Sequence, residues 1–213
     1  MSKKRRFLIT IVLFVLVFFL FNTEAKADSV VFEDTLGYSE RGHAKIIGQV
    51  RNNTNNPVTY VMVAATIYDK TGGIIDTGFT FTILDNLMPG ESSPFDLTVM
   101  QAGEEFARYS LNVEWKTGTR PDYRDLEIVQ SRGFYQGDNF KVVGEIKNTG
   151  NSPAKYVMIV CTGYDGEKKI AGVGFTFSTI STIQPGAKSP FDLTIINPPR
   201  KIETYLLQVQ GKQ

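Results

Sequence analysis

The sequence predicts an all-β protein, built from two tandem antiparallel sandwiches that follow an N-terminal export signal. The first observation is a duplication: residues 30–116 and 126–212 align without a gap at an offset of 96, and 29 of 87 positions are identical. The string SPFDLT at 93–98 recurs unchanged at 189–194. This period exceeds the roughly 20–50 residues of solenoid repeats and matches one small domain. The chain is therefore expected to hold two copies of one fold.

The second observation is the N-terminus, which has the three-part layout of a secretory signal. Four bases at 3–6 precede an uncharged apolar run at 7–21, and Ala25-Lys26-Ala27 has a small-x-small form. We expect residues 1–27 to be a signal peptide that is cleaved after Ala27. The alternative is an uncleaved membrane anchor, although 15 residues span only about 23 Å as a helix, less than the roughly 30 Å hydrocarbon core. Contact with a membrane is expected only if cleavage fails.

Cleavage also changes the charge, because it removes five bases and one acid. The mature chain keeps 18 bases and 21 acids, a net charge of −3. Nucleic-acid binding depends on a concentrated basic patch, so no nucleic-acid partner is expected.

The third observation is strand-like alternation of β-branched and aromatic residues with polar ones. In copy one, the expected strands are 29–34, 44–51, 58–69, 74–83, 94–100 and 107–116. Turn chemistry separates them: an Asn-rich turn at 52–57, a hairpin at 69–73, and a type II turn at Pro89-Gly90. Copy two repeats these turns at 148–153, 165–169 and Pro185-Gly186.

Six or seven short strands in fewer than 100 residues predict one antiparallel sandwich per copy. Phe95, Leu97 and Val99 are expected to face the core, with Pro94 and Pro190 opening a strand. The predicted boundaries are domain one at 28–116, a linker at 117–125 and domain two at 126–213. A nine-residue linker is expected to restrict the mutual orientation of the domains.

Several strings in both copies resemble the FxLYD domain. In copy one they are Gly48-x-Val50-x-Asn52, Asn55-x-Pro57-x-x-Tyr60-Val61, residues 64–69, and Leu87-x-Pro89-Gly90-x-x-x-Pro94-Phe95; copy two matches at Gly144, Asn148, Asn151, Pro153, Tyr156, Val157, Tyr164, Asp165, Pro185, Gly186, Pro190 and Phe191. The name-motif itself keeps only its Tyr-Asp in each copy. The resemblance implies an immunoglobulin-like sandwich in a prokaryotic cell envelope and no established activity.

No catalytic, cofactor or metal site is expected. His43 is the only histidine, and in a predicted turn it is expected to be solvated; a Ser-His-Asp relay needs a histidine at the right place, and a copper site needs two with a cysteine. The carboxylates of Asp69, Asp85, Glu91 and Asp96 fall on separate elements, which argues against calcium.

Cys161, the only cysteine, is expected to fill a small core position as a buried thiol. The alternatives are a redox or intermolecular role, or a soft-metal site with Met158.

Other repeated residues are expected to be structural. Tyr68-Asp69 and Tyr164-Asp165 end a strand, where the carboxylate would cap the turn. The pairs Phe79/Phe81 and Phe175/Phe177 are expected to face the core, with an exposed aromatic strip as the alternative.

The expected binding residues lie in the exposed turns and the linker: Asn52, Asn53, Asn55, Asn148 and Asn151, together with the bases Lys116, Arg120 and Arg124. Asn52-Asn53-Thr54 is also a glycosylation sequon, so Asn52 is a possible acceptor.

The residues therefore predict a non-catalytic extracytoplasmic module that binds or spaces envelope components, with another envelope protein or a glycan as partner. Addition of a strand to an exposed sheet edge is a natural binding mode for such a sandwich. Two alternatives remain: an accessory or chaperone-like subunit of a secreted or membrane assembly, and a small-molecule receptor with a site between the domains. The oligomeric state stays open.

Overall fold

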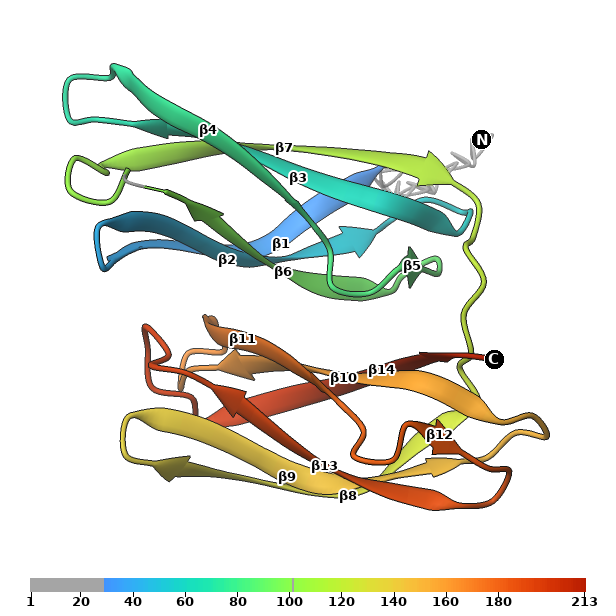
Figure 1. Cartoon of the computed structure of the whole chain (residues 1–213). Helices are drawn as coiled ribbons and strands as arrows, with labels where there is room; N and C mark the ends of the chain where they lie inside the picture. The colour runs from blue at the N-terminus through green and yellow to red at the C-terminus, as the bar shows by residue number, and fades with distance from the viewer. Residues whose placement is uncertain (1–28, 101) are drawn as a thin grey trace, which may run out of the picture.

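The computed structural model describes residues 29–100 and 102–213, whose regular structure consists of strands (Figure 1). The signal segment and its cleavage site lie outside these residues. Copy one holds β1 (Val30–Glu40), β2 (His43–Asn52), β3 (Val58–Tyr68), β4 (Ile74–Phe81), β5 (Asn86–Leu87), β6 (Ser92–Val99) and β7 (Arg108–Thr117). Copy two holds β8 (Leu126–Gln136), β9 (Asn139–Asn148), β10 (Ala154–Tyr164), β11 (Ile170–Phe177), β12 (Thr182–Ile183), β13 (Lys188–Ile195) and β14 (Thr204–Lys212). Each strand starts 96 positions after its counterpart.

Each copy folds into two facing antiparallel sheets, which confirms the predicted immunoglobulin-like sandwich class. In copy one, β1-β2-β6 faces a sheet in which β4, β5 and β7 all pair with β3. In copy two, β8-β9-β13 faces a sheet in which β11, β12 and β14 pair with β10. The four sheets stack as successive layers, with β1-β2-β6 next to β11-β10-β14 (Figure 1).

Alternating side chains fill one apolar core per copy. Phe95, Leu97 and Val99 are buried, as predicted, while the intervening Asp96 and Thr98 point away from this core. Pro94 does not open its strand, because β6 begins two residues earlier at Ser92. Pro94 and Pro190 instead lie inside β6 and β13, which are edge strands, where a missing N–H leaves no ladder hydrogen bond unmade.

Close contact with an aromatic ring explains one repeated glycine. A Cβ on Gly48 would lie 2.5 Å from the Phe95 ring, and a Cβ on Gly144 would lie 2.6 Å from the Phe191 ring. Only glycine allows the strand to pass this close to the ring at the centre of each sandwich.

The turns follow their predicted chemistry. The amide of Glu91 donates to Met88 O over 2.9 Å, and Gly90 between them has a φ of 80°. This is the hydrogen bond and the positive third-position φ of a type II turn. Gly186, with a φ of 77°, occupies the same place in copy two.

The second copy packs directly on the first. Val160 on β10 is fully buried and belongs to the core cluster of copy one, and Met158 packs against the same cluster. Hydrogen bonds cross this interface at several points: Tyr164 Oη donates to Gln49 Oε1 (3.0 Å), the Ile170 amide donates to Asp34 Oδ2 (2.6 Å), and Gln208 Nε2 donates to Ser92 O (2.8 Å). The residues on the outer face of β2 are therefore interior residues of the whole chain.

The connecting segment is also fixed. Tyr123 is buried and exchanges two backbone hydrogen bonds with Gly211 of β14, at 2.8 and 2.9 Å. The Lys212 ammonium bonds the carboxylate of Asp85, and the Asp85 amide donates to Gln210 Oε1 over 3.1 Å. These contacts join the end of copy two to the β4–β5 loop of copy one.

Candidate functional site: an interdomain cleft

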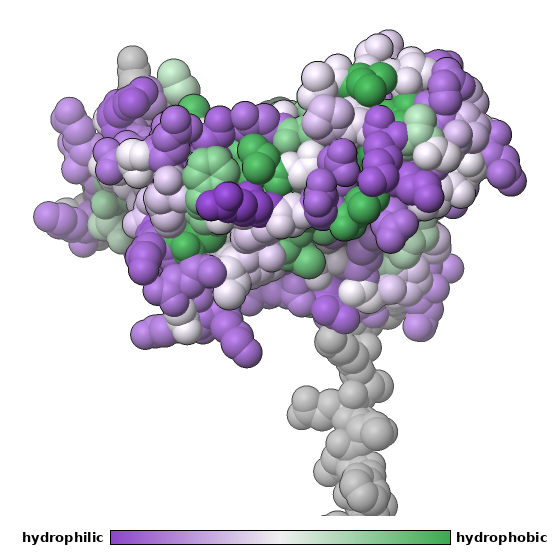
Figure 2. Space-filling model, turned by 90° about the horizontal axis from the view of Figure 1, so that it is seen from below, coloured by the Kyte–Doolittle hydropathy of each residue, from purple (hydrophilic) through white to green (hydrophobic). Residues whose placement is uncertain are grey.

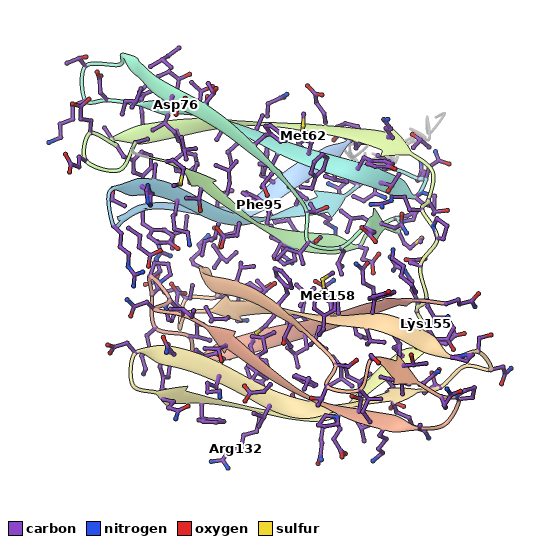
Figure 3. All side chains as sticks on the ribbon, viewed as in Figure 1. Met62, Asp76, Phe95, Arg132, Lys155 and Met158 are labelled. Atoms are coloured by element: carbon purple, nitrogen blue, oxygen red, sulfur yellow. The ribbon has the colours of Figure 1, made fainter. Side chains whose placement is uncertain are left out.

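A hollow of about 620 Å³ lies between the two copies. Copy one contributes residues of β1, β2, β4 and β6, and copy two contributes residues of β10, β11 and the end of β13. One wall is apolar and includes Ile47, Phe81, Met158, Phe175 and Pro198. Figure 3 shows Met158 between the layers of the two copies.

Tyr38, Lys45 and Asp96 form a polar part of the lining, the polar end of the cleft. Lys45 Nζ lies 3.4 Å from Glu40 Oε2 and 3.7 Å from Asp96 Oδ2, and 5.9 Å from the centre of the Tyr38 ring. Burial raises the pKa of Asp96, and the Lys45 ammonium offsets this only in part. Burial alone would lower the pKa of Lys45, but Asp96, Tyr38 and Glu40 outweigh it and raise that pKa.

Burial also raises the pKa of the Tyr38 phenol, which is therefore neutral at neutral pH. The polar end thus presents one carboxylate, one ammonium and one hydroxyl, and the Glu40 carboxylate pairs with the same ammonium from outside the lining. This set can hold a polar group of a ligand, while the aromatic wall holds an apolar group.

The expectation that the repeated phenylalanines face the core is wrong. Phe79 is 67% exposed, and Phe81, Phe175 and Phe177 are 48–53% exposed. Each pair stacks edge to face, with ring centres 6.3 Å apart in copy one and 6.2 Å apart in copy two. Phe81 and Phe175 line the cleft. Exposed rings in both copies are more typical of a surface that binds a partner than of residues that stabilise the core.

A strained tyrosine lies next to this wall. Tyr60 has a φ of 50° at a bulge in β3, and its counterpart Tyr156 has a φ of 46°. An aromatic residue in this region costs about 1–3 kcal/mol, and such strain concentrates at functional sites. Arg120 and Lys116 lie 4.9 and 5.1 Å from the Tyr60 ring. Tyr60, Arg120 and Phe81 line a second hollow of about 240 Å³.

Asn52 and Asn148 do not face solvent, so the expectation of binding residues at these two positions is wrong. Both side chains are fully buried. Asn52 Nδ2 donates to Asn56 O (2.8 Å) and Leu87 O (2.9 Å), and Asn148 Nδ2 donates to Ser152 O and Ile183 O, both at 2.8 Å. Both amide hydrogens of Asn52 are used, so attachment of a glycan would break the turn. The expectation of an exposed sequon is corrected accordingly.

The remaining turn asparagines differ from these two. Asn55 and Asn151 are exposed, and Asn53 is partly buried, with its amide donating to Ser29 O over 3.0 Å. All three lie outside the lining of the cleft. Their role in binding stays a prediction.

The repeated Tyr-Asp residues sit at hairpins, where the carboxylates hold the turn. Asp69 Oδ1 accepts from the Thr71 amide (2.7 Å), the Thr71 hydroxyl (2.7 Å) and the Gly73 amide (2.8 Å). These bonds, that of the Thr71 side chain first, lower the pKa of Asp69. Asp165 is similar: its bond from the Lys169 amide is the main cause of a lowered pKa.

The linker bases stabilise the junction between the copies. Arg124 Nη1 lies 2.8 Å from Glu91 Oε1, its Nε lies 2.6 Å from Asp122 Oδ2, and its Nη2 donates to Asn86 O over 2.8 Å. Arg120 Nη1 lies 3.0 Å from Asp85 Oδ1. Arg124 is thereby engaged inside the chain, whereas Arg120 also borders the second hollow.

Cys161 is fully buried in the core of copy two, and burial raises the pKa of its thiol to about 12. His43 begins β2, next to the turn at Arg41-Gly42. Within residues 29–100 and 102–213, no group of three or more His, Cys, Asp or Glu side chains is placed to hold a metal ion. The same residues include no helix with the length and apolar character of a membrane span.

The sequence pattern does not single out Tyr38 or Lys45, and it brings Asp96 into view only as one of several scattered carboxylates. A signal was nevertheless present, since Lys45 and Asp96 are identical in copy two as Lys141 and Asp192. There the two groups form an ion pair of 2.9 Å on the outer face of the β8-β9-β13 sheet.

The sequence matches no family model and no curated protein. Among solved structures, red sea bream transglutaminase matches with a TM-score of 0.26 and 8% identity, over 86% of this chain and 29% of that one. A β-glucuronidase of glycoside hydrolase family 2 matches with a TM-score of 0.27 and 13% identity, over 78% and 21%. A calcium-binding mutant of Bacteroides uniformis β-glucuronidase 2 matches with a TM-score of 0.23 and 13% identity, over 76% and 23%. The chain spans less than a third of each.

Proposed function

We propose that this chain is a non-catalytic extracytoplasmic binding module whose ligand occupies the interdomain cleft. The observation that carries the proposal is the composition of that cleft, where an aromatic wall meets one cluster of ionisable groups across a boundary between two domains. Its volume of about 620 Å³ lies within the roughly 300–1,000 Å³ of ligand sites, which favour such boundaries.

The charges at the polar end favour a cationic ligand. Asp96 supplies a carboxylate in the lining, and Glu40, which lies outside the lining, supplies a second carboxylate paired with the same Lys45 ammonium. An incoming ammonium or guanidinium group would balance the remaining negative charge, whereas an anion would meet two like charges. We therefore propose an amphipathic ligand with an apolar group and one positive charge, such as a short peptide segment of an envelope protein.

The extracytoplasmic location in this proposal rests on the sequence of residues 1–27. The FxLYD resemblance supports the same location and remains part of the proposal. Sequencing the N-terminus of the mature protein tests it: a start at Asp28 is expected, and an intact Met1 on protein extracted from membranes would contradict cleavage.

Binding is tested by fluorescence anisotropy with the peptide Phe-Leu-Lys amide, whose N-terminal amine carries the fluorescent label, so that lysine holds its only positive charge. Phe175→Ser is expected to weaken binding about tenfold. The ligand would cover this ring, and loss of that apolar contact costs at least about 1.4 kcal/mol of binding free energy. Phe177→Ser is the matched control, since Phe177 is equally exposed on the same strand but lies outside the cleft lining. The Asp96→Asn variant is expected to weaken binding of this peptide more than binding of Phe-Leu-Gln amide. Equal loss from both phenylalanine variants, or tighter binding of Phe-Leu-Glu amide, would contradict the proposal.

A further inference from the structure

The interface between the two copies uses two different faces of one fold. Copy two contributes the outer face of β11-β10-β14, and copy one contributes the outer face of β1-β2-β6. Each face has a counterpart on the other copy that the described residues leave uncovered. These counterparts, the outer faces of β4-β3-β7 and β8-β9-β13, lie at opposite ends of the four-layer stack (Figure 1). A contact between different faces is head to tail, so it adds copies at both ends unless the rotation between copies closes a ring.

The uncovered β4-β3-β7 face has many of the same side chains as the β11-β10-β14 face, which packs on copy one. Seven residues are identical at the equivalent positions: Met62, Thr66, Tyr68, Ile74, Phe79, Phe81 and Lys116 match Met158, Thr162, Tyr164, Ile170, Phe175, Phe177 and Lys212. Ile170 is 1% exposed at the interface, whereas Ile74 is 67% exposed. Figure 3 shows Met62 on this outer face, one sandwich away from Met158. The face therefore resembles an unused copy of the docking surface.

The uncovered β8-β9-β13 face carries a hollow. The equivalent place on the β1-β2-β6 face of copy one is where copy two packs. This hollow has a volume of about 370 Å³, and Gln130, Val143 and Glu145 are among its lining residues. Their counterparts Asp34, Ile47 and Gln49 lie at the interdomain interface. Asp34 and Gln49 accept the hydrogen bonds of Ile170 and Tyr164.

We propose that these two faces bind each other between molecules, so that the chain associates head to tail with further copies of itself. Several hydrogen bonds of the interdomain interface keep a donor and an acceptor in this arrangement, although Ser181 in place of Asp85 removes the bond to a lysine. Glu145 can accept from the Tyr68 hydroxyl as Gln49 does from Tyr164, and Gln130 can accept from the Ile74 amide. Glu114 can likewise accept from the Ser181 amide, as Gln210 does from Asp85.

The association is weaker than the contact within the chain. Val143 replaces Ile47, Ala64 replaces Val160, and Arg132 replaces Leu36, so the apolar part of the contact shrinks. The view from below shows separate apolar side chains among hydrophilic ones on this face (Figure 2), and Arg132 points away from the molecule (Figure 3). The contact between molecules also lacks the linker, which gives the two domains a high effective concentration.

Sedimentation velocity and light scattering on the mature chain test this proposal, from about 10 µM to about 1 mM protein. The average mass is expected to rise with concentration and to pass twice the monomer mass, because an open contact adds copies at both ends. Ile74→Asp is expected to abolish the rise. Met100→Asp is the matched control, since Met100 is similarly exposed, at 64%, and follows β6, outside both uncovered faces and outside the cleft lining. A plateau at the dimer mass, or equal loss in both variants, would overturn the proposal.

A second variant strengthens the contact instead of removing it. Ala64→Val with Val143→Ile restores the two apolar residues of the interdomain interface at the uncovered faces. It is expected to lower the concentration at which association begins by several-fold. A monomer at all concentrations, in both the natural chain and this variant, would also overturn the proposal. Because none of these substitutions lies in the cleft lining, the result is independent of ligand binding.

Discussion

Val160 provides the sharpest test of how the two copies are joined. Its side chain is fully buried and packs into the core cluster of copy one, although it lies on the outer face of its own sandwich. Copy one has Ala64 at the equivalent position, so the fold itself accepts alanine there. Val160→Ala therefore perturbs the contact between the copies and leaves each sandwich intact.

The magnitude follows from the two methyl groups removed. At about 0.8 kcal/mol per buried methylene, with a smaller addition for the cavity, the contact loses about 2 kcal/mol. Such a loss raises the population of separated domains about 30-fold. Trypsin measures this population, because Arg124 in the linker is held by Glu91 and Asp122 while the domains are in contact.

We expect trypsin to cut the linker of Val160→Ala about 30-fold faster than the linker of the natural chain, at protease concentrations too low to trap every opening. Val63→Ala is the control, since it removes the same two methyl groups from inside copy one. It should lower the urea midpoint without a comparable rise in linker cleavage. A linker cleavage rate for Val160→Ala within about twofold of the natural chain would refute the reasoning.

Three further predictions concern single residues. Cys161 should resist thiol reagents at pH 8 until the protein is denatured, because its thiol is buried and has a pKa of about 12; rapid labelling of folded protein would exclude this burial. Asp69→Asn should destabilise the protein at neutral pH in urea titrations. Because the folded pKa of Asp69 lies below its unfolded value near 3.8, its contribution is full above that value and is lost as the pH falls through the folded pKa. The variant and the natural chain should therefore converge in strong acid, and a constant difference at all pH values would count against the turn-capping role. Asn148→Ala should lower the free energy of unfolding by about 2–4 kcal/mol, because it leaves buried hydrogen-bond partners unsatisfied; a change below about 0.5 kcal/mol in urea unfolding would show that these bonds do not matter.

The duplication and the period-two alternation were enough to predict two all-β sandwiches, because both depend only on local pattern and on turn chemistry. The same alternation could also have shown that Asn52 faces inward, since it shares parity with Ile46 and Val50. Its residue type instead favours an exposed turn. The side chain is buried because its amide satisfies backbone carbonyl groups of the turn, which residue type alone does not reveal.

The orientation of the phenylalanines could not be predicted from alternation alone, which gives two possible faces. The deciding contact is tertiary: a Cβ on Gly78 would lie 2.8 Å from Val99 of the facing sheet, so β4 presents its small residues inward. Phe79 and Phe81 then point outward. The sequence predicts a site between the domains only as an alternative and names no residues for it. Those residues come together only when one copy packs on the other.

The most direct test of the cleft uses methionine methyl groups as probes. Met158 lines the cleft, and Met62 occupies the same position of copy one, outside that lining (Figure 3). In a spectrum of the mature chain with ¹³C-labelled methionine methyls, Phe-Leu-Lys amide is expected to shift the Met158 signal and leave Met62 in place. Dilution without peptide is expected to shift Met62 alone, which separates ligand binding from self-association. A Met158 signal that stays unchanged at saturating peptide, or that moves together with Met62, would contradict a binding site in the interdomain cleft.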